Sequence, residues 1–269
     1  MDFDERPYVE EIRDDSVYER MDLWETSFGL QATDNLKPSA YMVSLAKAHV
    51  LGEKDYEEIS NDLNTYYSNH EDGYETMEAD FASLRINEIL STTGFTFSPA
   101  TLLSYHRRLF SGITSFRYPV GEFRKVNITK SEEVLGGDSV IYTDFSDISD
   151  TLNWDFSQEK GFDYGGLSKE EMAHHVMDFI SNAWQVHPFR EGNTRTVAVF
   201  TIKYLRHLGF EINNTPFKQN AKYFRDALVI ANAKRPLQTK RFLKKFTENI
   251  LLDGKNALDK KEMIKPDNP

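Results

Sequence analysis

A stretch of ten residues in the second half of the chain, 187–196, combines side chains that phosphate chemistry needs. Its histidine, His187, has an ordinary pKa near neutrality and can accept a proton from an incoming hydroxyl. Gly192 and Asn193 are the residue types that most readily adopt positive φ, so their successive amides can form an anion-binding nest. Arg195 adds a planar fork that suits phosphate oxygens. The stretch therefore predicts a phosphate-handling loop with its own base.

Helical patterns flank this loop on both sides. Apolar residues recur at three- and four-residue spacings over 172–184 and again over 197–208, which predicts two amphipathic helices. Pro188 disfavours a helical residue before it, so the first helix should end near His187. The second helix then directs its N-terminus, with its unpaired amides, at the bound phosphate. Glu191 would repel a phosphate unless a divalent cation lies between them, and Mg²⁺ is usually held in this way.

The loop sequence HPFREGNTR closely resembles the signature of the Fic (Fic/Doc, or Fido) family, written H-P-F-x-[D/E]-G-N-G-R-x-x-R. Members of that family typically transfer AMP from ATP to a Ser, Thr or Tyr hydroxyl of a protein, with Mg²⁺. The resemblance implies that His187 is the base, that Phe189 is a core anchor and that Glu191 is the Mg²⁺ ligand. It assigns nucleotide binding to four residues, Gly192, Asn193, Thr194 and Arg195. It also implies a protein target and ATP as partners.

Two positions depart from this signature. Thr194 stands where a glycine is usual, which narrows the anion hole, and Ala198 stands where a second arginine normally grips the γ-phosphate. The preferred nucleotide is therefore open, and phosphorylation or transfer from another nucleotide is an alternative on the same scaffold. A non-catalytic nucleotide-binding regulatory module is an alternative of another class, although the intact His187 argues against it. Without the resemblance, the loop would be read as a plain connection between two helices.

The first part of the chain reads as short helices separated by turns, over 18–67. The run 36–53 and the acidic helix after it resemble the small antitoxins that partner some Fic toxins, here fused in front. Their inhibitory helix carries [S/T]-x-x-x-E-[G/N], and Asp34 and Asn35 occupy the last two positions as a degenerate version. In that family the inhibitory glutamate pairs with the second arginine of the signature. Because Ala198 replaces that arginine, we expect Asp34 to lack an arginine partner and to restrain the enzyme only weakly.

A change of period marks the segment between the two helical regions. Apolar and polar residues alternate over 121–128. The turn 136–138 joins the short apolar runs 134–135 and 140–142, which predicts a β-hairpin. In Fic proteins a hairpin called the flap lies over the catalytic loop and pairs with an extended segment around the modified hydroxyl. The resemblance thus implies three target-docking residues, Val140, Ile141 and Tyr142. The alternative is a structural ribbon at the edge of the domain.

These patterns predict a mainly α protein: a Fic-type helical domain with one small β-hairpin, preceded by a small helical module. We place the antitoxin-like module at 1–73, the catalytic domain at 74–253 and a polar, frayed tail at 254–269. The polar run 68–73 is the expected junction between module and domain.

Two further groups of polar residues have plainer interpretations. The histidines 174–175 follow the glutamates 170–171 by one helical turn, but an E-x-x-x-H pair lacks the remaining ligands of a metal site. We interpret them as exposed helix residues. His106 lies beside the arginines 107–108, and a helix face with extended arginines is favoured there over a phosphate site.

Composition narrows the function classes. The 269 residues suffice for one large domain or a domain with a small module, and the lack of cysteine excludes disulfides and thiol catalysis. A net charge of −11 and a pI of about 5.2 argue against general nucleic-acid binding. The N-terminus lacks an apolar signal region, and no apolar run approaches the length of a membrane span. We expect a soluble cytoplasmic protein with no membrane partner; the sequence leaves its oligomeric state open, a homo-oligomer included.

Overall fold

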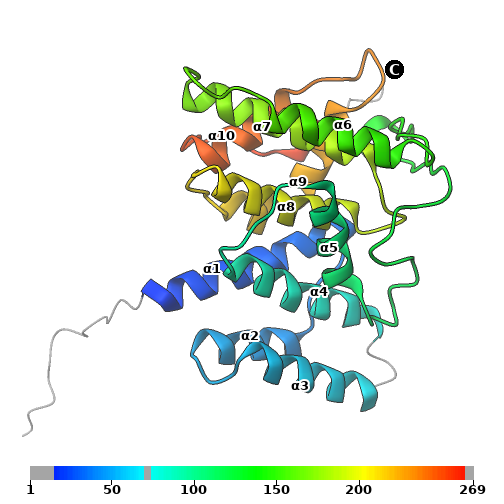
Figure 1. Ribbon diagram of the computed structural model, residues 1–269. Coiled ribbons are helices and arrows are strands. Elements are labelled where there is room, and N and C mark those ends of the chain that lie inside the picture. Colours follow the sequence, from blue (N-terminus) through cyan, green and yellow to red (C-terminus); the bar gives the residue numbers. More distant parts are fainter. Residues whose placement is uncertain (1–14, 70–73, 264–269) are drawn as a thin grey trace, which may run out of the picture.

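The computed structural model describes residues 15–69 and 74–263, and within them it contains ten α-helices and no β-strand (Figure 1). The predicted mainly α fold is confirmed. The N-terminal residues 1–14, most of the expected junction (70–73) and the last six residues (264–269) lie outside the described part. Among the described helices, none is long and apolar enough to cross a membrane.

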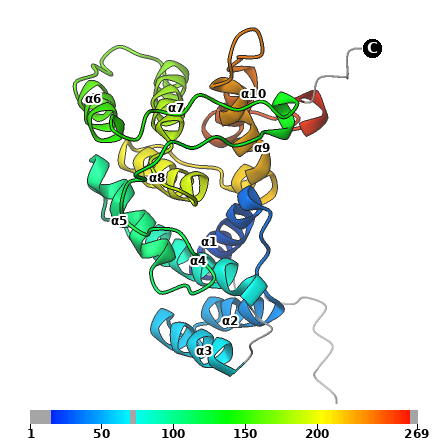
Figure 2. The same ribbon diagram turned by 90° about the vertical axis from the view of Figure 1, so that its right-hand side faces the viewer.

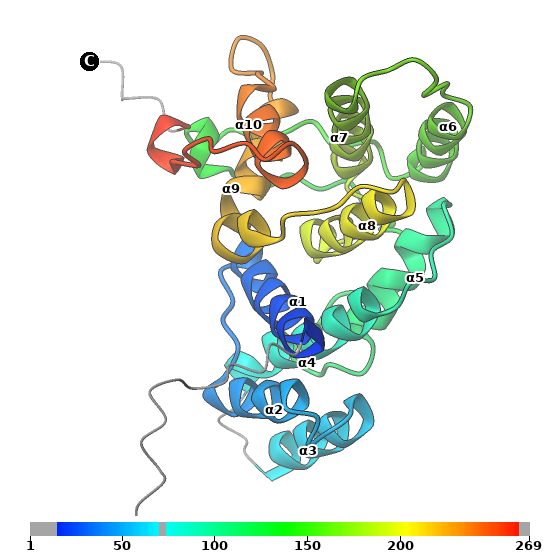
Figure 3. The same ribbon diagram turned by 90° about the vertical axis from the view of Figure 1, so that its left-hand side faces the viewer.

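The helices stack along one long axis (Figures 1 and 3). At one end lies the pair α2 (Ala40–Val50) and α3 (Tyr56–Asn69), and at the other end lie α6 (Ile148–Lys160), α7 (Lys169–Val186) and α10 (Arg241–Leu251). The middle is formed by α1 (Asp15–Gln31), α4 (Tyr74–Ser91), α5 (Pro99–Phe110), α8 (Asn193–His207) and α9 (Thr215–Ala231). Short 3-10 turns complete the chain at η1 (Ala32–Asp34), η3 (Glu133–Leu135) and η4 (Lys260–Glu262).

The first helix beside the loop ends at His187 and the second ends just before Gly209, as the sequence predicts. Ser168 and Glu171 form a capping box at the start of α7, which satisfies amides that have no partner within the helix. The helix ends at His187, whose φ of 49° and ψ of 59° are left-handed, directly before Pro188. α8 starts after Gly192, at φ 77°. The six residues 187–192 therefore form a tight connection between two helices.

Helix α1 packs against α4 and α9, so the first described helix is part of the central layer (Figure 3). Gly29 makes the contact with α9 close: a Cβ on Gly29 would lie 2.4 Å from the carbonyl oxygen of Lys218. The α2–α3 pair is tied to α4 through buried Asp80, which accepts hydrogen bonds from the amide of Ser39 (2.7 Å) and from the hydroxyl of Tyr67 (2.6 Å). The expected domain limits at 73 and 253 stay predictions.

The predicted β-hairpin is wrong: among the described residues, the segment between α5 and α6 has no strand (Figure 2). Its turn does form, since Gly136 and Gly137 have positive φ and the amide of Glu132 donates to the carbonyl of Asp138 at 2.9 Å. The next backbone pair is missing, because the amide of Lys130 donates to the hydroxyl of Ser139 at 3.2 Å. The 3-10 turn η3 includes residues 134–135, the expected end of the first strand. Residues 126–145, called the flap loop below, therefore form an irregular loop that contains the turn η3.

The described part of the expected tail, 254–263, is packed and does not fray. Asn256 and Asn249 exchange two hydrogen bonds of 2.8 Å. Lys260 pairs with buried Asp226 at 2.8 Å, and Met263 is buried. These contacts hold the chain after α10 against α9 and α10.

Candidate active site

His187 lies at the end of α7 with its imidazole enclosed between aromatic rings. The ring stacks on Tyr142 at 4.1 Å between centroids and meets the edge of Trp184 at 5.1 Å. Its Nδ1 is 3.4 Å from the carbonyl oxygen of Trp184, an acceptor, so Nδ1 carries the proton and Nε2 keeps its lone pair. Burial, with the positive charges of Lys130 and Arg124 nearby, lowers the pKa of His187 to about 3. The imidazole is therefore neutral at pH 7, as a general base must be.

Arg124 fixes the backbone around His187, a role that the sequence pattern did not indicate. Its buried guanidinium donates to the carbonyl oxygens of His187 at 2.9 Å and Val126 at 2.8 Å, and also to that of Thr143. Its amide donates to the carbonyl of Pro188 at 2.8 Å. One cation thus joins both ends of the flap loop to the C-terminal end of α7, where the helix dipole favours positive charge. The alternating pattern gave no sign that Arg124 differs from its neighbours.

A second buried residue that holds the loop is His106 of α5, for which the sequence favoured a helix face with extended arginines over a phosphate site. His106 is fully buried. Its Nδ1 accepts from the amide of Gly121 at 2.9 Å, so Nε2 carries the proton and donates to the carbonyl of Glu191 at 3.1 Å. Its ring stacks on Phe189 at 3.9 Å, and burial lowers its pKa to about 4. Phe189 is fully buried, as expected of a core anchor.

The anion-binding nest is only partly as predicted. Gly192 has the expected positive φ, and a Cβ there would lie 2.4 Å from the Phe110 ring, so glycine is required. Asn193 does not share this conformation, because it is the first residue of α8. Its side-chain amide closes the loop instead, accepting from the amide of Phe189 and donating to its carbonyl, both at 2.9 Å. The first amides of α8 remain the groups that could meet a phosphate.

The two residues that depart from the signature both point into the protein. The hydroxyl of Thr194 accepts from the indole nitrogen of Trp184 at 3.0 Å, which joins α8 to α7. Ala198 is fully buried. Neither residue lines the pocket described next, although Thr194 was expected to bind nucleotide.

A pocket of about 370 Å³ lies beside the loop, where η1, the flap loop, α8 and α9 meet. The cationic residues in its lining are Lys130, Arg195, Lys222 and Arg225, and the acidic ones are Asp34, Glu78, Glu132, Glu133, Glu191 and Asp226. Glu191 has no ion-pair partner among the described residues; one of its oxygens accepts from the amide of Gly192 at 3.1 Å. A carboxylate in this state fits the requirement for a Mg²⁺ ligand next to phosphates.

Arg195 lines this pocket and forms ion pairs with two acidic residues. Its Nε lies 2.6 Å from Oδ2 of Asp34, and its Nη2 lies 2.5 Å from Oε1 of Glu78. Its Nη1 donates to Gln31 at 3.2 Å, and its guanidinium lies 4.8 Å from the Phe110 ring centroid. Burial opposes the charge of Arg195, but the two carboxylates outweigh it and raise its pKa. The predicted phosphate-binding arginine is thus the centre of an internal ion-pair cluster, Asp34–Arg195–Glu78.

The expectation that Asp34 has no arginine partner is therefore wrong. Asp34 pairs with the first arginine of the signature, whereas the prediction considered only the position of the second, Ala198. The turn η1 holds Asp34 in place, and Asn35 ends that turn at φ 58°. The side-chain oxygen of Asn35 accepts from Lys222 at 3.1 Å. Both residues of the degenerate inhibitory position thus contact basic residues at the pocket.

Of the three expected docking residues, only Ile141 presents its side chain to solvent, at 62% exposure. Val140 is buried, and Tyr142 is buried against His187. The carbonyl of Ile141 accepts from Gln185 of α7 at 3.1 Å, which holds this part of the flap loop beside the active-site histidine.

Comparisons with known proteins indicate a family for part of the chain. Residues 96–205 match the model of the Fic/DOC family. A protein of Sinorhizobium fredii named "Probable protein adenylyltransferase" is 39% identical over 62 residues, which are 23% of this chain and 31% of that protein. The chain thus matches about a third of the length of this curated relative.

Two solved structures match this chain, and the first of them is similar in fold. A FIC domain containing signaling protein from Bacteroides thetaiotaomicron has a TM-score of 0.50 at 13% identity, covering 89% of this chain and 86% of that one. The N-terminal FIC domain of Bep8, a VirB-translocated effector protein from Bartonella sp. 1-1C, has a TM-score of 0.48 at 17% identity, covering 77% and 91%. The loop sequence and its position between α7 and α8, together with the family match over 96–205, show a Fic-type domain in this part of the chain.

Proposed function

We propose that this protein is a protein adenylyltransferase, which transfers AMP from ATP to a Ser, Thr or Tyr hydroxyl of a target protein or of itself. The observation that carries the proposal is the unpaired carboxylate of Glu191, which faces the same pocket as Arg195 beside the N-terminus of α8. Anion-binding amides, a metal ligand and a phosphate-binding arginine are the parts that a nucleoside triphosphate needs. The name of the Sinorhizobium relative supports adenylyl transfer in particular.

His187 supplies the base in this reaction. Its Nε2 takes the proton of the target hydroxyl as the oxygen attacks the α-phosphorus of ATP. The new oxygen–phosphorus bond forms in line with the bond that breaks between the α-phosphorus and pyrophosphate, which leaves with that electron pair. Mg²⁺, when held by Glu191, would neutralise charge on the phosphates. Arg124 and His106 keep the loop backbone in register for these steps through their bonds to the carbonyls of His187 and Glu191.

In this proposal the ion pairs of Arg195 with Asp34 and Glu78 restrain the enzyme in the structure described above. Phosphates that approach Arg195 must compete with the carboxylates of Asp34 and Glu78, which lie within 2.6 Å and 2.5 Å of its nitrogens. Activation then requires η1 to move away from α8, or the arginine to exchange one carboxylate for phosphate. The basic residues Lys222 and Arg225 on α9 line the same pocket and offer further phosphate contacts.

The main alternative is phosphorylation or transfer from another nucleotide by the same loop. It is favoured by Ala198, because a buried alanine cannot hold a γ-phosphate in the place where the family uses its second arginine. A nucleotide-binding module without catalysis is a second alternative. The intact His187 argues against that one, because binding alone has no use for a base.

The proposal is tested by incubating wild type and His187→Ala with Mg²⁺ and a cell lysate, in parallel with α-labelled and with γ-labelled ATP. Adenylyl transfer by the wild type places the α label on protein and leaves the γ label in pyrophosphate. The His187→Ala variant should produce neither labelled protein nor labelled pyrophosphate. Protein labelled from γ-labelled ATP alone would establish phosphorylation instead. ATP binding without protein label in either arm would establish the non-catalytic module.

A further inference from the structure

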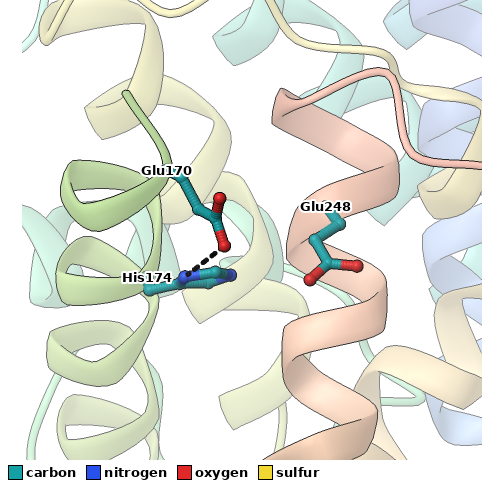
Figure 4. Close-up of side chains that lie close together, drawn as sticks. All are labelled: Glu170, His174 and Glu248. Carbon is teal, nitrogen blue, oxygen red and sulfur yellow. Dashed lines mark ion pairs between the residues drawn. The ribbon is translucent and has the colours of Figure 1, made fainter. Parts of the chain in front are cut away.

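Three metal-ligating side chains converge at the contact of α7 with α10, far along α7 from the active-site loop (Figure 4). Glu170 and His174 come from the first turns of α7, and Glu248 comes from α10. The ligand atoms of all three lie within 4.8 Å of one another. We propose that they bind a first-row divalent metal ion, with Zn²⁺ as the best fit. The sequence alone shows only the Glu170–His174 pair, which lacks further ligands, and the fold adds Glu248 to it.

The imidazole of His174 is the centre of this group. Glu170 and His174 are four residues apart, which places both on one face of the helix. The Nδ1 of His174 lies 4.0 Å from Oε1 of Glu170, and the ring lies between the two glutamates (Figure 4). Its Nε2 is buried and has no hydrogen-bond partner among the described residues. Buried polar atoms are normally satisfied, and a metal bond at this nitrogen would meet that need.

A hydrogen bond from Asn256 orients the carboxylate of Glu248. Its Oε2 accepts from the side-chain amide of Asn256 at 2.8 Å. Asn256 is held in turn by Asn249, because the backbone amide of Asn256 donates to Oδ1 of Asn249 at 2.8 Å. An outer hydrogen bond of this kind holds a carboxylate ligand in one orientation and leaves its other oxygen for the metal.

Lys244 shows that the group attracts positive charge. Its Nζ lies 3.6 Å from Oε1 of Glu170 and 3.9 Å from Oε1 of Glu248, so it stands between the carboxylates without a short contact to either. Its side chain is half exposed and can turn into solvent when a metal ion enters. The ammonium is therefore the competitor that a bound cation replaces.

The ligand set selects the metal. Mg²⁺ and Ca²⁺ prefer oxygen ligands alone, whereas a histidine with two carboxylates suits Zn²⁺ and its first-row neighbours. Bonds of about 2.0–2.2 Å put tetrahedral ligands roughly 3.4 Å apart, so the side chains must close in by about 1 Å. Glu170, which is 59% exposed, is free to make most of that movement. Water would complete the coordination, and the bound ion would link the start of α7 to α10.

Zinc titration of the full chain by calorimetry tests the proposal, with saturating Mg²⁺ present to occupy the active-site loop. One zinc site is expected in wild type. Glu248→Gln and His174→Ala should each weaken it by about tenfold to a hundredfold, comparable to or greater than the loss of an outer partner. Asp178→Asn is the matched control: this carboxylate is on α7 one turn after His174 and pairs with Lys240, so binding should be unchanged. Lys244→Ala should tighten binding, since it removes the competing cation.

Thermal unfolding gives an independent readout. Zinc should raise the Tm of wild type and of Asp178→Asn but not that of Glu248→Gln, because only binding to the folded state stabilises it. The metal-free Tm and circular dichroism of each variant establish that it folds. Equal zinc affinity in wild type, Glu248→Gln and His174→Ala would overturn the proposal and show adventitious binding elsewhere. A wild type with no zinc-dependent heat and no Tm shift would overturn it as well.

Discussion

Asp34 and Arg195 pair directly, with Oδ2 of the aspartate 2.6 Å from Nε of the arginine, and the arginine side chain is fully buried. Two segments that are far apart in sequence therefore meet at the one arginine that the proposed chemistry needs. Since Glu78 binds the same guanidinium, the arginine keeps a partner if Asp34 is lost. This relationship places the N-terminal segment at the candidate active site and leads to the first prediction.

Asp34→Ala should bind ATP more tightly and auto-modify faster, because phosphates then compete with one carboxylate at Arg195 and not with two. We expect a gain of about tenfold in affinity, equivalent to about 1.4 kcal/mol. The same change should lower the free energy of unfolding by about 1 to 3 kcal/mol, since a buried ion pair is broken while Glu78 remains. Calorimetry with ATP and urea unfolding measure the two effects.

The control for this variant is Glu25→Ala, which removes an exposed carboxylate of α1 that pairs with Lys218. It should change neither ATP affinity nor auto-modification. An Asp34→Ala protein with wild-type affinity for ATP would show that the ion pair is structural and does not oppose phosphate binding.

His187→Ala should lose protein modification and retain ATP binding, since the base acts on the hydroxyl while other groups hold the phosphates. The pH profile of the wild type carries the second half of this prediction. With a pKa of about 3, His187 stays neutral at pH 5, so activity should not fall between pH 8 and pH 5 through protonation of this group. A histidine with its ordinary pKa would be mostly protonated at pH 5. Single-turnover rates across this range, and ATP calorimetry on the variant, check both statements.

Stability should also depend on this histidine, with a sign that follows from the depressed pKa. In the unfolded chain His187 takes up a proton below about pH 6.5, whereas the folded form resists protonation until about pH 3. The stabilising contribution is therefore complete above pH 6.5 and is lost as the pH falls toward the folded pKa. The slope approaches about 1.4 kcal/mol per pH unit for one group. His187→Gln should reduce the slope measured by urea unfolding between pH 6 and pH 4; an unchanged slope would contradict the assignment.

Glu191→Gln should lower Mg²⁺-dependent activity by well over about tenfold, because a neutral amide cannot balance the ion's charge beside the phosphates. Glu133→Gln is the matched control, since Glu133 lines the same pocket from the 3-10 turn of the flap loop. The comparison is made as initial rate against Mg²⁺ concentration. Full wild-type activity in excess chelator would rule out the metal role of Glu191.

The features that the sequence predicted are local ones. Pro188 and the positive φ of Gly192 follow from residue type alone, and the apolar spacings fixed the ends of α7 and α8 within a residue or two. The prediction of a hairpin was wrong because a 3-10 turn and a serine hydroxyl take the place of the backbone hydrogen bonds that two paired strands would form. Contacts between segments that are distant in the sequence could not be predicted, because they depend on how the helices pack. Examples are the hydrogen bonds of Arg124 to the loop carbonyls and the position of Glu248 beside His174.

Arg124→Met should leave the protein folded but destabilised and nearly inactive. Methionine fills much of the same space yet leaves the carbonyls of His187, Val126 and Thr143 without their shared donor. Buried carbonyls without partners cost about 1 to 3 kcal/mol each, less where water enters. We expect a loss of roughly 3 kcal/mol in unfolding free energy, with weakened ATP turnover even at temperatures where the variant is fully folded. Arg107→Met is the control, since it removes a single bond from an arginine to the carbonyl of Gly121.

Ile141→Asp should depress modification of a target protein while leaving ATP binding and the fold intact. Ile141 is the exposed member of the three expected docking residues, and it lies between Val140 and Tyr142, which are both buried. Because its carbonyl is bonded to Gln185 beside His187, its side chain is held at a fixed place near the catalytic base. An apolar side chain held there can pack against a target, whereas a charged one resists desolvation on docking. The rate of target modification is compared with that of auto-modification in the same sample, and Phe145→Asp serves as a second exposed position further along the loop. If Ile141→Asp modifies its target at the wild-type rate, the flap loop of this protein is structural and the target docks on another surface.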